Sequence, residues 1–185
     1  MIEVRECSKA FGQTKAVNQA TLDIGDREVF GLVGSNGAGK STLLRMMAGI
    51  IRPDQGEILI DDLPVYENEE AKKLFFYISD DSYFPANYTA MDLVRFYRNF
   101  YPQFRTRFFH ELMEQFHLEE NRRIATFSKG MKKQVSVICG VCAGTDYLFC
   151  DETFDGLDPV MRQTVKSIFI GDMEERNLTP IIASH

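Results

Sequence analysis

The fold is decided by one stretch near the N-terminus, EVFGLVGSNGAGKSTLLRMM (residues 28–47). It begins with a continuous apolar run, Glu28 to Val33, which is typical of a fully buried strand. A glycine-rich loop follows, and Lys40 to Met47 has the apolar spacing of a helix. A strand, a glycine loop and a helix in this order predict an α/β fold with the loop at the carboxyl end of the strand.

The loop between these two elements matches the phosphate-binding pattern G-x-x-x-x-G-K-[ST]. Its glycines allow backbone N–H groups to point at phosphate oxygens, and the helix start adds partial positive charge. Lys40 can reach the β- and γ-phosphates of a nucleotide, and the Ser41 hydroxyl can ligate Mg²⁺. A flexible glycine turn would not need Lys-Ser in this register. We therefore expect nucleotide binding by Gly34, Ser35, Asn36, Gly37, Ala38, Gly39, Lys40, Ser41 and Thr42.

Two carboxylates follow a second apolar run. Tyr147 to Cys150 predicts a buried strand that ends in Asp151 and Glu152. The acids should emerge at the carboxyl end of the sheet, beside the phosphate loop. Asp151 suits Mg²⁺, directly or through water, and Glu152 is placed to orient an attacking water and accept its proton. A lone Asp-Glu after a strand is usually a solvated turn, but the upstream phosphate loop favours the catalytic interpretation.

The rest of the chain surrounds these elements with recognisable patterns. Ile2 to Cys7 and Val17 to Ile24 alternate apolar and polar residues, as half-buried antiparallel strands do. Apolar residues recur at helical spacing from Thr89 to about Arg123. Helical patterns then alternate with the strands at Tyr147 to Cys150 and Thr179 to Ser184. The sequence therefore predicts a mostly parallel sheet covered by helices, preceded by antiparallel strands and interrupted by a helical insertion.

Composition narrows the class of protein. The 185 residues, 44% of them hydrophobic, can bury one substantial core, and the net charge of -6 argues against a nucleic-acid partner. Cys139 and Cys142 have the spacing of a redox or zinc motif, but no second pair accompanies them, so we predict core packing. No cationic leader opens the sequence and no apolar stretch suits a membrane span, which predicts a cytoplasmic location.

Further motifs occur in an order found in one known family. Phe11 precedes a glycine, residues 127–134 are FSKGMKKQ, residues 154–158 are FDGLD, and the last residue is His185. Together with the phosphate loop and the two carboxylates, these motifs resemble those of the ATP-binding subunits of ABC transporters. The resemblance runs from the first predicted strand to the final residue.

The resemblance implies a single ABC-type ATPase domain. Its P-loop NTPase (RecA-like) core would comprise about 1–78 and 128–185, with a helical subdomain at about 79–127 and the usual C-terminal part missing. Phe11 would lie against adenine, and His185 would contact the γ-phosphate or the attacking water. Ser128 and Gly130 would bind the γ-phosphate of ATP held by a second subunit, although Ser128 could merely cap its own helix.

The resemblance also implies an activity and partners. Two such subunits, identical or different, would enclose ATP and Mg²⁺, with Lys40 neutralising charge and Glu152 aligning water. ATP hydrolysis would power transport through a separate membrane permease, which places the subunit on the inner face of the cell membrane. The motifs around Ser128 and residues 154–158 are most similar to those of bacterial export-type subunits.

Three positions depart from the family pattern. Asp80 occupies the place of a glutamine that touches Mg²⁺ and water, Lys129 replaces a glycine, and Thr153 replaces a common proline. A carboxylate can ligate Mg²⁺ as an amide does, but it adds negative charge near the phosphates. Two alternatives therefore stay open. One is a regulatory ATP-binding module with little hydrolysis, and the other is a soluble ABC-type ATPase that is not linked to transport.

Overall fold

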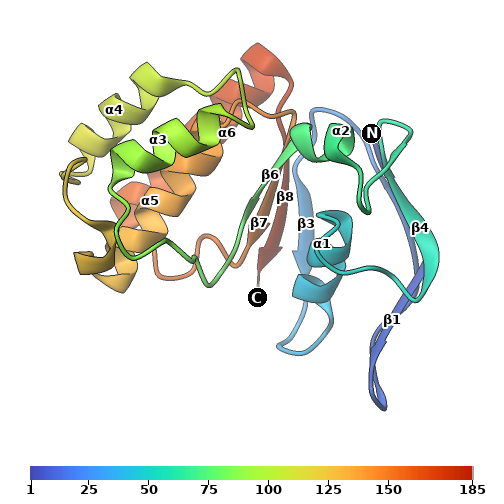
Figure 1. The fold of residues 1–185 in the computed structure, drawn as a ribbon. Helices are drawn as coiled ribbons and strands as arrows, with labels where there is room; N and C mark the ends of the chain where they lie inside the picture. Colours follow the sequence, from blue (N-terminus) through green and yellow to red (C-terminus); the bar gives the residue numbers. More distant parts are fainter. Residues whose placement is uncertain (185) are drawn as a thin grey trace.

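Two four-stranded sheets form the body of the protein in the computed structural model, which describes residues 1–184 (Figure 1). The first sheet is antiparallel and contains, in spatial order, β2 (Thr14–Ile24), β1 (Ile2–Phe11), β4 (Gln55–Ile60) and β5 (Leu63–Pro64). The second sheet is parallel and contains, in spatial order, β3 (Phe30–Val33), β8 (Thr179–Ser184), β7 (Tyr147–Asp151) and β6 (Phe75–Ile78).

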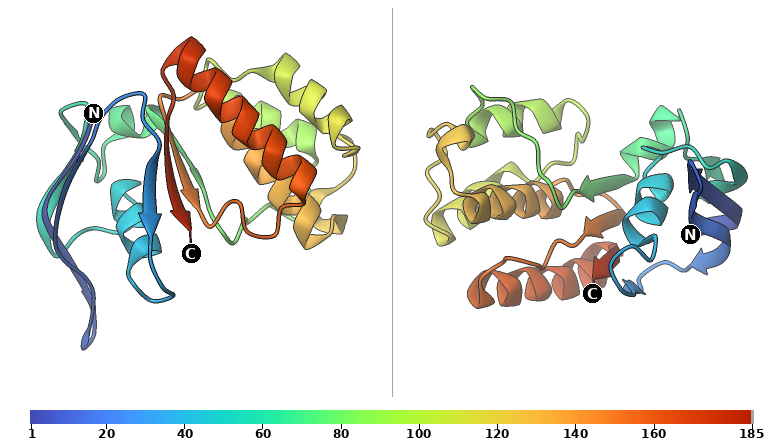
Figure 2. Two further views of the ribbon diagram at one scale, coloured as in Figure 1. Left: turned by 180° about the vertical axis from the view of Figure 1, so that it is seen from behind. Right: turned by 90° about the horizontal axis from the view of Figure 1, so that it is seen from below.

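The helices lie on both faces of the parallel sheet (Figure 2). α1 (Lys40–Met47) lies between the two sheets. The opposite face of the parallel sheet is covered mainly by helices from the second half of the chain. The remaining helices are α2 (Glu69–Lys73), α3 (Ala90–Arg98), α4 (Thr106–Gln115), the 3-10 helix η1 (Ile124–Thr126), α5 (Lys129–Cys142) and α6 (Pro159–Arg176).

Alternate residues of the parallel strands divide the core into two clusters. Phe149 and Phe75 pack on the α1 side, with ring centroids 5.0 Å apart. Leu148 and Cys150 pack on the other side, against α3 to α6. This two-residue alternation is expected of strands that are covered on both faces. The α/β fold with a parallel sheet and an N-terminal antiparallel region is therefore confirmed.

The helical insertion contributes α3, α4 and η1, which lie within residues 79–127. A capping box at Thr89 and Asp92 begins α3, because each side chain accepts a backbone N–H of the other residue. Helix α5 packs against α3 and α4 and also against β6. The boundary of the helical subdomain at residue 128 stays a prediction, because α5 contacts both parts.

The expectation of a fully buried strand from Glu28 to Val33 is wrong. The strand begins at Phe30, and its side chains alternate, with Val33 79% exposed. β3 is an outer strand of its sheet, and the face that carries Phe30 and Leu32 packs against the core. An apolar run does not by itself distinguish a strand covered on both faces from a strand covered on one.

Two other expectations concern the cysteines and the membrane. All four cysteines are buried free thiols, and Cys139 and Cys142 lie inside α5, as core packing predicts. Within residues 1–184, every helix is too short or too polar to cross a membrane.

Candidate functional site

The loop between β3 and α1 has a backbone that requires glycine at its end. Gly39 has a φ of 88°, and a Cβ there would lie 2.0 Å from the carbonyl oxygen of Ala16 in β2. No larger residue fits this contact without moving β2 away from the loop. Among residues 1–184 no side chain caps the first turn of α1, so its backbone N–H groups are available to an anion.

Lys40 places a positive charge directly on this loop. The residue is buried, and its Nζ donates to the carbonyl oxygens of Gly34, at 2.7 Å, and Ser35, at 3.1 Å. The lysine therefore folds back over the loop that precedes it. A charge held there by backbone oxygens can transfer its hydrogen bonds to phosphate oxygens without a large movement of the side chain.

A polar cluster connects α1 to the end of β7. The Ser41 hydroxyl donates to Asp151 Oδ1 at 2.7 Å, and the Tyr77 hydroxyl donates to Asp151 Oδ2 at 2.8 Å. Arg45 Nη2 lies 3.8 Å from the same Oδ2. Burial, followed by the neighbouring carboxylate, raises the pKa of Tyr77 well above its usual range, so Tyr77 remains a neutral donor. Asp151 is fully buried and needs these partners.

This cluster has the ligand chemistry that Mg²⁺ prefers. A hydroxyl oxygen and a carboxylate oxygen, 2.7 Å apart, meet where β7 ends beside α1. Hard oxygen donors from one Ser and one carboxylate, completed by phosphate and water, are a common Mg²⁺ site in nucleotide-binding proteins. Ser41 and Asp151 therefore fit the ion, and their contact with Mg²⁺ stays a prediction.

Glu152 follows β7 and has an unusual backbone. Its φ is 47°, in the left-handed region, where residues other than glycine are uncommon. Its N–H donates to Ala183 of β8 at 3.1 Å, and its carbonyl accepts from Asp155 N–H at 3.2 Å and from Lys133 Nζ at 2.7 Å. The predicted catalytic carboxylate therefore leaves the sheet from a peptide that is hydrogen-bonded on both sides.

Asp80, two residues after the end of β6, pairs with the same lysine. Its Oδ1 lies 3.0 Å from Lys133 Nζ, and its side chain is half exposed. Contact between Asp80 and Mg²⁺ stays a prediction. The register of β3 and β8 sets Ser184 opposite Val33, at the start of the phosphate loop. His185 lies outside the described residues, so its contact with phosphate stays a prediction as well.

Phe11 ends β1 with its ring half exposed and Lys9 Nζ 5.8 Å from the ring centroid. The same hairpin continues through Thr14, opposite Phe11, to Ala16, which touches Gly39. An exposed ring in a hairpin that contacts the phosphate loop is available to stack on a base.

Ser128 caps α5, as one of the two interpretations of the sequence states. Its Oγ accepts the N–H of Met131 at 3.2 Å. A Cβ at Gly130 would meet Ser128 Oγ at 3.9 Å, an ordinary contact, and both residues are exposed. The start of α5 lies apart from the loop between β3 and α1 in Figure 1. An anion bound at Ser128 would therefore be distinct from one held by the phosphate loop of the same chain.

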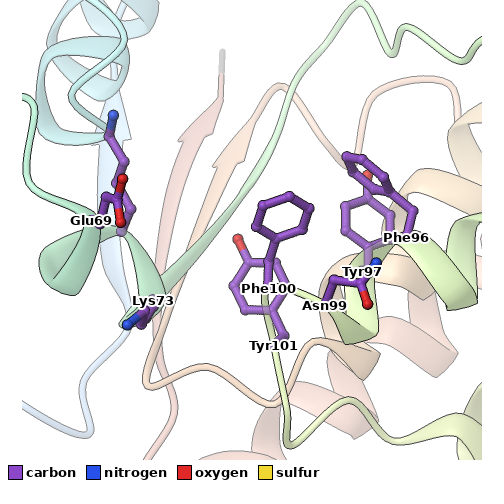
Figure 3. Close-up of a pocket in the computed structure, with 8 residues that line it drawn as sticks. Glu69, Lys73, Phe96, Tyr97, Asn99, Phe100 and Tyr101 are labelled. Carbon is purple, nitrogen blue, oxygen red and sulfur yellow. The ribbon is translucent and has the colours of Figure 1, made fainter.

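A separate apolar groove lies between α2 and the end of α3 (Figure 3). Its volume is about 600 Å³. Glu69 and Lys73 come from α2, whereas Phe96 and Tyr97 come from α3. The whole lining is Glu69, Lys72, Lys73, Phe96, Tyr97, Asn99, Phe100 and Tyr101. The Tyr101 hydroxyl donates to Phe75 at the amino end of β6, so the groove and Asp80 lie at opposite ends of that strand.

Comparison with known proteins identifies the family. A family model described as ABC transporter matches residues 17–155, which include the phosphate loop, residues 127–134 and both carboxylates. The chain belongs to the ABC transporter family. It is 34% identical over its whole length to the ABC transporter ATP-binding protein YtrB of Bacillus subtilis (strain 168), and it spans 63% of that protein's length. It is 29% identical to the lipopolysaccharide export system ATP-binding protein LptB of Haemophilus influenzae, covering all of the chain and 80% of LptB.

Solved structures of ABC transporter cassettes share the fold. An ATP-binding subunit of an ABC transporter superposes with a TM-score of 0.88 at 25% identity, covering the whole chain and 79% of that structure. A dimeric ATP-binding cassette in a post-hydrolysis state, bound to ADP and Pi, superposes with a TM-score of 0.86 at 20% identity, covering the whole chain and 88% of that structure. The predicted P-loop NTPase fold is therefore confirmed for this member of the family.

Proposed function

We propose that this chain is an ATP-binding subunit that hydrolyses ATP to ADP and phosphate and powers an ABC transporter. The observation that supports this proposal most directly is the 2.7 Å hydrogen bond between Ser41 and Asp151. It joins the phosphate loop to the strand that delivers Glu152, so the group that would bind phosphate and the group that would activate water are adjacent. The dimeric relative bound to ADP and Pi supports the reaction.

Each residue has one task in this mechanism. The loop N–H groups and Lys40 bind the phosphates and orient the terminal phosphoryl group. Ser41 and Asp151 would hold Mg²⁺, which would supply charge neutralisation for the phosphates. Glu152 orients a water molecule and accepts its proton as the water oxygen bonds to the γ-phosphorus and the bond to ADP breaks. Phe11 stacks on adenine.

Replacing Glu152 tests the reaction. Glu152→Gln removes the proton acceptor but keeps the shape, so turnover should fall by about 100-fold or more while ATP binding is retained. Phosphate release and nucleotide binding measure the two effects. Glu111→Gln, in an exposed ion pair with Arg107, is the matched control and should match the wild type. Turnover of Glu152→Gln at the wild-type rate would remove Glu152 from the mechanism.

A second ATP-binding subunit would complete each site. The exposed start of α5, with Ser128 and Gly130, would bind the γ-phosphate held by the partner's loop. Sedimentation with a non-hydrolysable ATP analogue and Mg²⁺ tests this pairing of like or unlike subunits, and protomers alone at high concentration would refute it. The relative LptB is named for a lipopolysaccharide export system, which supports an export-type transporter.

We also propose that the permease docks in the groove of Figure 3. Phe96 and Phe100 are exposed aromatic side chains. The lining also carries Lys72, Glu69 and Lys73, and Lys73 pairs with Glu70 at 2.6 Å. A permease segment with apolar side chains and an acidic group would complement the aromatic rings and Lys72. Phe100→Glu should abolish co-purification with the permease and leave basal ATP turnover intact. Retained co-purification would exclude the groove.

A further inference from the structure

Lys133 is a buried lysine that no step above uses. It lies in the second turn of α5 and is only 7% exposed. Its Nζ donates to the carbonyl oxygen of Glu152 at 2.7 Å and to Asp80 Oδ1 at 3.0 Å. An ammonium group is rarely removed from water unless acceptors replace its hydration. The ammonium group of Lys133 in α5 therefore connects two other segments of the chain, which carry Glu152 and Asp80.

The carbonyl contact acts on the backbone of Glu152. A φ of 47° is unfavourable for a residue with a Cβ, so the conformation persists because hydrogen bonds around it hold it. The N–H of Glu152 is fixed by Ala183, and its carbonyl is fixed by Lys133 and Asp155. Fixing both peptide planes sets the direction in which the Glu152 side chain leaves the chain. Lys133 supplies the charged hydrogen bond of this set.

Asp80 is the counter-ion of this lysine. Its carboxylate is half exposed, so the ion pair closes the outer end of a buried ammonium. An uncharged side chain at position 80 would leave Lys133 without a carboxylate partner in this contact. Asp80 and Lys133 therefore form one ion pair, although 53 positions separate them in the chain.

We propose that Lys133 is a positioning residue for the ATP hydrolysis proposed above, and that Asp80 holds it in place. Lys133 fixes the backbone from which Glu152 reaches the attacking water. Its effect is on the chemical step, because it touches neither the phosphate loop nor the groove. Asp80 contributes to this positioning through its ion pair with Lys133.

The test measures kcat and KM for ATP on the whole purified chain. Lys133→Met should lower kcat by about tenfold or more, because small misplacements of a catalytic group are costly, while KM changes less than twofold. Lys133→Arg, which keeps a charged donor, should recover much of the loss. Asp80→Asn should lower kcat by a smaller factor and should add nothing in the Lys133→Met background. Lys166→Met, an exposed lysine of α6, is the control.

The outcomes separate this inference from the proposed function. If Glu152→Gln loses turnover but Lys133→Met keeps the wild-type kcat, the positioning role is overturned and the ATPase stands. If the wild type releases no phosphate from ATP, the proposed function fails. If Glu152→Gln keeps its turnover, the role of Glu152 fails, and with it the positioning role of Lys133, whereas ATP hydrolysis stands. Should Lys133→Met not fold, Asp80→Asn decides, and an unchanged kcat in that variant overturns the inference. A lower kcat together with a higher KM in Lys133→Met, without recovery in Lys133→Arg, would also overturn the inference, because this combination indicates structural damage.

Discussion

Tyr77 offers a direct measurement of how the buried carboxylate of Asp151 is stabilised. Tyr77→Phe removes the hydroxyl that donates to Asp151 Oδ2 at 2.8 Å and changes little else in volume. A hydrogen bond to a charged acceptor contributes about 1.5–3 kcal/mol to stability. Asp151 keeps its bond from Ser41, so we expect a loss of about 2 kcal/mol in the free energy of unfolding.

Thermal unfolding without nucleotide measures this loss. For a domain of this size, each kcal/mol shifts Tm by about 2–4 °C, so Tyr77→Phe should unfold about 4–8 °C below the wild type. Tyr83→Phe removes a hydroxyl from a side chain that is 88% exposed and should leave Tm unchanged. A Tyr77→Phe variant that unfolds together with Tyr83→Phe would refute the role given to this hydrogen bond.

The difference in stability between the wild type and Tyr77→Phe should depend on pH in one direction. The folded-state pKa of Tyr77 is raised above the usual value, by burial and then by Asp151. Its contribution is therefore fully present below pH of about 10, the unfolded pKa, and is lost as pH rises above it. The gap in stability between the wild type and Tyr77→Phe should narrow as pH rises above about 10. A gap that widens would contradict the assignment.

Three further predictions concern the loop, the start of α5 and the thiols. Gly39→Ala should abolish nucleotide binding by equilibrium titration, because its Cβ would collide with Ala16; retained affinity would contradict the loop geometry. Ser128→Ala should destabilise the chain by about 1 kcal/mol in denaturant unfolding through loss of the helix cap, and no change would contradict the capping contact. Burial raises the pKa of Cys142 and of Cys150 to about 12, so a thiol reagent at pH 8 should label neither until the protein unfolds.

Elements with strong local signals were predictable from the sequence. Helix Lys40–Met47 and strand Thr179–Ser184 have the predicted bounds, because a glycine loop and flanking polar residues mark their ends. Pro159 begins α6 immediately after the Asp158 cap, as its fixed φ favours. The exposed side chains of β3 were not predictable, because they depend on the position of β3 at the edge of its sheet, which is set by tertiary structure.

The missed residues of the site are those whose partners are distant in sequence. A tyrosine in the otherwise apolar strand Phe75–Ile78 was the available signal for Tyr77, since a buried hydroxyl needs a partner. The pairing of β6 with β7, which brings Tyr77 beside the end of the carboxylate strand, is a tertiary fact. Lys133 gave no local signal, because a lysine in a polar helix start is ordinarily solvated.

Helix α5 carries Ser128 at its beginning and Lys133 little more than one turn later. A short stretch of α-helix is stiff, so a tilt imposed at its first residue also displaces the ammonium group that holds Glu152. In a pair of such chains, Ser128 of one chain would bind the γ-phosphate held by the other chain. This binding would then change the position of Glu152 in the chain that carries Ser128. The first turns of α5 would then couple ATP hydrolysis at the two nucleotide sites of the pair.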